Sequence, residues 1–177
     1  MKFISESDRP LYQEVRARLH GATTWKERVQ RCMPESQFFP PASDLDLVAI
    51  QQALGHGIPN DLEEILSESN GIESPYSSLI YSAARIIEVN QMLRSVDYLA
   101  DRMPFDHLIF FGTVSDGDEF AFPLFRNGAF GDAVFVWSHE TDCREEYAMS
   151  LADYIAKYTV QLYTPYMKKR NSPPGNR

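Results

Sequence analysis

Apolar residues recur at helical spacing in the first part of the chain, where two helices and a linker are predicted. Over residues 8–33 the apolar side chains fall near one helical face, and Gly21 divides this stretch into two helices. Thr24 and Glu27 have the spacing of a capping box at the start of the second helix. Residues 34–41 contain three prolines, which predict a linker because proline fits neither a helix interior nor a central strand.

Two further helices are indicated by serine residues that precede apolar runs. Ser43 is placed to cap a helix over residues 44–54, which Gly55 would end. Ser82 is placed to cap another helix that runs toward Leu99.

Between these two helices, the segment 58–71 carries the most complete set of helix signals in the chain. A proline stands near its start, acidic residues occupy its first turn, and Asn-Gly stands at its end. Asn60 and Glu63 have the spacing of a capping box. A narrow apolar stripe predicts the buried face, which consists of Leu62, Ile65 and Leu66.

Beyond Pro104 the pattern changes to that of strands. Residues 108–114 form an apolar run, residues 119–125 alternate, and residues 133–138 form a third strand. The turns between them are too short for crossover connections, so the sheet is predicted to be largely antiparallel. Pro123 indicates an edge strand or a bulge.

These elements together predict a single α+β domain. A short strand at 79–81 and a closing helix capped by Ser150 complete the order. Phe110 and Phe111 are consecutive and point to opposite faces of their strand, so either both faces are covered or one face binds a partner. The predicted organisation is a helical N-terminal arm with a proline-rich linker (1–41), the α+β domain (42–163) and a flexible basic tail (164–177).

Composition fits a packed globular protein. Of the 177 residues, 44% are apolar and 12% aromatic, and no run approaches the roughly 20 apolar residues that span a bilayer. The N-terminus has no signal-peptide pattern.

Cys32 and Cys143 are far apart and predict two reduced thiols in a cytoplasmic protein, with a disulfide between them as the alternative.

The net charge of −8 is unevenly distributed. Residues 1–167 carry 25 acidic against 13 basic residues, because four bases lie in the last ten positions. Such a surface disfavours nucleic acid and anionic membranes and favours a basic protein partner. Plain solubility is the alternative explanation.

The order and spacing of four segments resemble the SUKH superfamily, which includes fungal cell-wall synthesis regulators and bacterial immunity proteins. The resemblance covers about residues 44–160, and the longer N-terminal arm departs from it. The segments that carry it are the helix pair at 45–54 and 57–71, the helix start at 85–90, the hairpin at 111–120, and the strand and helix at 136–140 and 150–155.

The resemblance implies a compact α+β fold with no catalytic centre and no cofactor. Bacterial members bind secreted toxins, many of them nucleases, and occlude the toxin active site. Fungal members act as regulatory scaffolds, and that is the alternative function for this chain, with the arm at 1–41 or the basic residues 168–170 as contacts.

A search for catalytic patterns gives only weak candidates. Asp116, Asp118 and Glu119 cluster as Mg²⁺ or Ca²⁺ ligands would, but no calcium-binding loop surrounds them. His139 and Cys143 supply two ligands, whereas structural zinc has four. A small metal-dependent hydrolase is therefore the weakest alternative, and we expect neither a metal nor a catalytic residue.

The predicted partner-binding surface is a set of acidic residues on two loops. We expect a hairpin-tip loop and the loop after the third strand to present them together to a basic toxin domain. The residues are Asp116, Asp118, Glu119, Asp142, Glu145 and Glu146.

Overall fold

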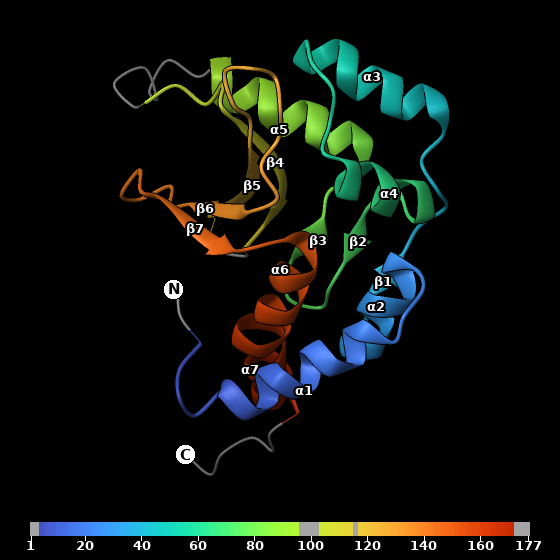
Figure 1. The fold of residues 1–177 in the computed structure, drawn as a ribbon, viewed down its shortest axis with the longest axis vertical. Helices are drawn as coiled ribbons and strands as arrows, with labels where there is room; N and C mark the ends of the chain where they lie inside the picture. The colour runs from blue at the N-terminus through green and yellow to red at the C-terminus, as the bar shows by residue number, and fades with distance from the viewer. Residues whose placement is uncertain (1–3, 96–102, 115–116, 172–177) are drawn as a thin grey trace.

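The computed structural model describes residues 4–95, 103–114 and 117–171 (Figure 1). Helices and two antiparallel sheets form one α+β domain, as predicted. The first sheet has the order β1-β2-β3 and the second the order β4-β5-β6-β7. In the described ranges, no helix combines the length and the apolar character needed to cross a membrane.

The N-terminal arm packs on the domain. Its helices are α1 (Arg9–His20) and α2 (Trp25–Cys32), and α1 contacts both α2 and the later helix α6. The side chain of Thr24 caps α2 by accepting the N–H of Glu27 at 3.1 Å. The Glu27 carboxylate accepts the N–H of Thr23 instead of that of Thr24, so only half of the predicted capping box forms.

The first sheet joins the proline-rich segment to the centre of the chain. Its strands are β1 (Gln37–Phe38), β2 (Ile72–Glu73) and β3 (Ser78–Ile80). The predicted linker therefore contains a two-residue strand. This strand lies at the edge of the sheet, where neighbouring prolines are tolerated.

Helix α3 (Asp44–Leu54) forms as predicted. Ser43 and Asp46 make a complete capping box, and Gly55 ends the helix in the left-handed conformation with φ 77°.

Helix α4 (Asn60–Glu68) lies where a helix was expected, but its ends differ from the prediction. Asn60 is already the first helical residue and makes no side-chain cap, so the predicted capping box is wrong. At the other end, Asn70 accepts the N–H of Ala83 at 2.7 Å instead of ending the helix. Gly71 has φ 97°, and a Cβ there would lie 3.0 Å from the Ser82 nitrogen. The Asn-Gly pair therefore fixes the chain against the start of the next helix.

Helix α5 (Ala83–Ser95) is joined to the second sheet by a buried amide. Asn90 donates to the carbonyl of Phe110 at 2.8 Å and accepts its N–H at 3.0 Å. The predicted continuation toward Leu99 lies outside the described residues.

The second sheet consists of β4 (Leu108–Thr113), β5 (Glu119–Pro123), β6 (Val134–Trp137) and β7 (Arg144–Ala148). The sequence prediction missed β7 and placed Glu145 and Glu146 in a loop, because the strand begins with three charged residues. Of the two positions that Pro123 indicated, the edge strand is wrong, because β5 lies between β4 and β6 and the proline is its last residue. The pair of β4 and β5 does contain an irregularity, but it lies between Phe110 and Gly112 and not at the proline.

Both faces of the second sheet are covered at strand β4. Phe110 contacts the rings of Phe105 and Trp137, whereas Phe111 contacts Phe122 and Tyr154 on the other face. Phe110 and Phe111 are both fully buried, so the first of the two predicted arrangements holds.

The C-terminal part is a long helical segment. Helix α6 (Leu151–Tyr158), capped by Ser150, continues through the π-helical turn η2 (Thr159–Tyr163) into α7 (Thr164–Arg170). The first part of the predicted tail is thus a helix, and Arg170 pairs with Glu35 at 2.7 Å.

Candidate functional site

A hollow of about 430 Å³ opens beside the second sheet. Strands β5, β6 and β7 meet there with η2 and the loop between β2 and β3. Its only charged lining side chains among the described residues are two carboxylates, Asp118 and Glu145. The remaining walls are mostly apolar or aromatic, and the full lining is Tyr76, Val114, Asp118, Phe120, Val136, Ser138, Thr141, Cys143, Glu145, Tyr147 and Leu162.

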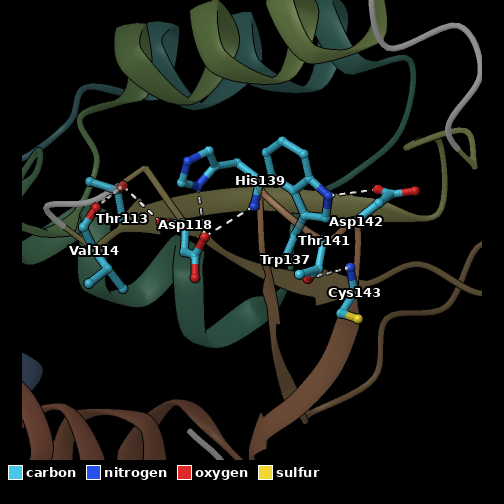
Figure 2. Close-up of polar contacts among 8 residues, drawn as sticks. All are labelled: Thr113, Val114, Asp118, Trp137, His139, Thr141, Asp142 and Cys143. Carbon is cyan, nitrogen blue, oxygen red and sulfur yellow. Dashed lines mark hydrogen bonds and ion pairs between the residues drawn. The ribbon is translucent and has the colours of Figure 1, made fainter.

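Asp118 is held in place just before β5. Its Oδ1 accepts hydrogen bonds from the backbone N–H of His139 at 3.1 Å and from its Nδ1 at 2.9 Å (Figure 2). Its backbone carbonyl accepts the hydroxyl of Thr113 at 2.9 Å. Figure 2 shows its other carboxylate oxygen, Oδ2, directed away from His139. The carboxylate is therefore oriented before any partner arrives.

Glu145 reaches the same hollow from β7. Residues at alternate positions of a strand share a face, and Cys143, Glu145 and Tyr147 all line the hollow. The structure thus brings together Asp118 and Glu145, which the sequence placed on two separate loops.

The side chain of Asp142 makes contacts within the protein that fix a turn. It adopts φ 57°, a left-handed conformation that aspartate tolerates better than most residues. Its carboxylate accepts the Trp137 indole N–H at 2.8 Å and lies 3.2 Å from the Arg144 guanidinium. Arg144 is itself stacked over the ring of Phe105. Asp142 therefore fixes the turn between β6 and β7 and is not among the residues lining the hollow.

Glu146 is exposed and neighbours Glu145 on β7, so the two side chains point to opposite faces of the strand. Glu146 is available to a partner only on the face that does not form the hollow.

Glu119 differs most from the expected surface acid. It is 9% exposed, and both of its carboxylate oxygens accept the hydroxyl of Tyr81, at 2.8 and 3.1 Å. Burial raises the pKa of Glu119 to about 7. The side chain is an interior group, and its placement at the hairpin surface is corrected. Asp116 lies outside the described residues.

The described residues offer no cluster of three or more potential metal ligands. Asp118 engages both the ring and the backbone of His139, so this contact fixes the β5–β6 end of the sheet.

The two cysteines are free thiols in different surroundings. Cys143 is exposed and lines the hollow, whereas Cys32 is buried, and burial raises the pKa of its thiol to about 11.

Sequence reasoning missed the apolar walls of the hollow. Tyr76 comes from the loop after β2, and Leu162 comes from η2, more than 80 positions later. Neither has a local signal, because only the tertiary fold places them opposite β6.

No curated protein matches the chain. Residues 41–157 match the model of the SMI1 / KNR4 family (SUKH-1), which covers more than half of the sequence. The matched region includes the whole second sheet and strands β2 and β3 of the first, whereas β1 precedes it. It also includes every lining residue of the acidic hollow except Leu162. The chain therefore belongs to the SMI1 / KNR4 (SUKH-1) family.

Proposed function

We propose that this chain is a non-catalytic, cytoplasmic protein-binding domain that acts as an immunity protein: it binds a basic toxin domain and covers the toxin's active site. The acidic hollow is the observation that carries the proposal. Its two lining carboxylates and apolar walls favour a cationic side chain of a protein over a nucleic acid or an anionic membrane.

A lysine or arginine side chain is complementary to the hollow. Its aliphatic stem would pack on Val114, Val136 and Leu162, as long basic side chains do on apolar surfaces. Its charged end would reach Asp118 and Glu145, where charge-assisted hydrogen bonds are stronger than neutral ones. The contact between Asp118 and His139 reduces the ordering cost, because one carboxylate is already held in place.

The whole-molecule charge supports the same partner. With a net charge of −8, the chain attracts a basic domain at long range and accelerates the encounter. Once the hollow holds one side chain, the rest of the domain blocks access to the toxin surface around it. This inhibition is steric and needs no catalytic group.

The test is binding and rescue with a basic toxin domain, chosen from the gene beside that of this chain where that gene encodes one. Co-expression with that domain in a bacterial host should restore growth. The double variant Asp118→Asn/Glu145→Gln removes two charges and preserves side-chain size, and it should weaken binding about tenfold or more, as expected for lost charge-assisted contacts.

A matched control removes the same charge elsewhere. Asp132 and Glu63 do not line the hollow, so Asp132→Asn/Glu63→Gln should change the dissociation constant by less than about twofold. Equal weakening by both double variants would show that binding depends on the net charge of the chain and not on the hollow. Failure of the unmodified chain to bind and to rescue growth would refute the immunity function.

A further inference from the structure

A second hollow, of about 210 Å³, lies between the N-terminal arm and the start of α6. Helices α1 and α6 pack against each other. In contrast to the first hollow, the lining is mainly basic among its charged groups. It consists of Arg16, Leu19, His20, Arg28, Met149, Ser150, Ala152 and Asp153.

The two arginines of this hollow make no close ion pair in the described residues, although the charge of Arg28 opposes the rise in the pKa of Asp61 that burial causes. In the described part of the chain, ion pairs within 4 Å are made by Arg18, Arg31 and several later basic residues, but not by Arg16 or Arg28. His20 stands four positions after Arg16 and thus on the same face of α1. Two guanidinium groups without a close ion pair and an imidazole therefore line one cavity.

Aromatic rings hold both guanidinium groups in position. Arg28 lies over the ring of Trp25 at 4.4 Å, and Arg16 lies over that of Tyr12 at 5.7 Å. The rings are themselves fixed: the indole of Trp25 donates to Glu64 at 3.0 Å, and the hydroxyl of Tyr12 donates to Asp153. Stacked guanidinium groups lose less side-chain entropy when they bind a ligand.

Asp153 is the one acidic residue in the lining, and its charge is already compensated. It is 5% exposed, accepts the hydroxyl of Tyr12 and the N–H of Met149, and lies 3.6 Å from the Lys157 ammonium. Asp153 also occupies the first turn of α6, and the basic side chains that line the hollow all come from the arm.

We propose that this hollow binds a phosphate group, either as the free ion or as a small phosphate monoester. Planar guanidinium groups match the oxygen pairs of phosphate and bind them through two parallel hydrogen bonds. Arg16, His20 and Arg28 precede residue 41, so the basic side chains of the site come from an extension that the family match does not include, whereas the lining residues of α6 and the segment before it lie within the match. It is independent of the immunity function.

The experiment is a titration of the full chain with inorganic phosphate and, separately, with phenyl phosphate, at constant ionic strength maintained with chloride. Binding is followed by calorimetry and by tryptophan fluorescence, because Trp25 lies directly under Arg28. We expect saturable binding of at least one of these two ligands. Tighter binding of phenyl phosphate would identify a monoester site, and tighter binding of inorganic phosphate would identify a site for the free ion.

Two double variants localise the site. Arg16→Gln/Arg28→Gln should weaken binding about tenfold or more. Arg18→Gln/Arg31→Gln removes the same charge from the same two helices outside the hollow and should change binding by less than about twofold. Circular dichroism confirms that each variant is folded. Binding no stronger than that of chloride, or equal weakening by both variants, would overturn the proposal.

Discussion

The carboxyl group of Glu119 lies in the interior against the hydroxyl of Tyr81, with the guanidinium of Arg85 stacked over the Tyr81 ring. Desolvation raises the pKa of Glu119 most, and Tyr81 and Arg85 oppose this rise. The sequence showed an acid at the start of a strand, but an alternating pattern does not say whether a face is covered. Glu119 was expected on the binding surface, and the structure shows that it lies in the interior.

The raised pKa predicts a specific pH dependence of stability. The folded-state pKa of about 7 exceeds the ordinary value of 4.5, so the folded protein binds this proton more tightly than the unfolded chain. The stabilising contribution of protonated Glu119 to the free energy of unfolding is fully present below the ordinary pKa of 4.5. It is lost as the pH rises from there through about 7. The shift corresponds to about 3 kcal/mol in the free energy of unfolding.

Glu119→Gln should remove that dependence, because the amide stays neutral and its oxygen still accepts the Tyr81 hydroxyl. Urea unfolding at about pH 5 and about pH 8 measures the change. The variant should gain stability relative to the unmodified chain at the higher pH and little at the lower. The same difference at both pH values would contradict the assigned pKa.

At the scale of elements, local sequence signals predicted correctly where helices form, but they predicted less well the residues at which the helices begin and end. Ser43 and Asp46 form the capping box of α3, and local chemistry alone determines that contact. Asn60 has the same spacing to Glu63, but Pro59 precedes it and Asn60 itself is helical. Strand β7 was missed because three charged residues begin it, and the buried Tyr147 and Ala148 leave too short an apolar pattern.

This difference between two similar motifs can be measured. Ser43→Ala should lower the free energy of unfolding by about 1 kcal/mol, because the first turn of α3 loses its cap. Asn60→Ala should change it by less than about 0.5 kcal/mol, because the side chain caps nothing. Equal losses in thermal or urea unfolding would show that Asn60 does act as a cap.

At the scale of the whole molecule, the sequence predicted the α+β class and the family but not the hollow. The family resemblance follows from the order of local segments, and that order is visible in the amino-acid sequence alone. The hollow depends on Tyr76 and Leu162 meeting β6 from distant parts of the chain, and on which face of β7 carries Glu145. Long-range packing determines both features, so periodicity could not reveal them.

The two hollows differ in the charge of their lining and share no lining residue. Carboxylates are the charged groups of the hollow beside β6, whereas arginines from the N-terminal arm dominate the hollow beside α6. The proposed basic protein and the proposed phosphate group would therefore contact different side chains.

The two cysteines supply a direct measurement of the central claim that a basic toxin domain covers the acidic hollow. Cys143 is an exposed free thiol that lines the hollow, whereas Cys32 is buried and serves as an internal reference. The alkylation rate of Cys143 by iodoacetamide is measured by mass spectrometry with and without the bound toxin domain, and Cys143→Ser confirms the assignment. The account predicts that binding slows the alkylation of Cys143 strongly, and an unchanged rate in a complex shown to have formed would contradict it.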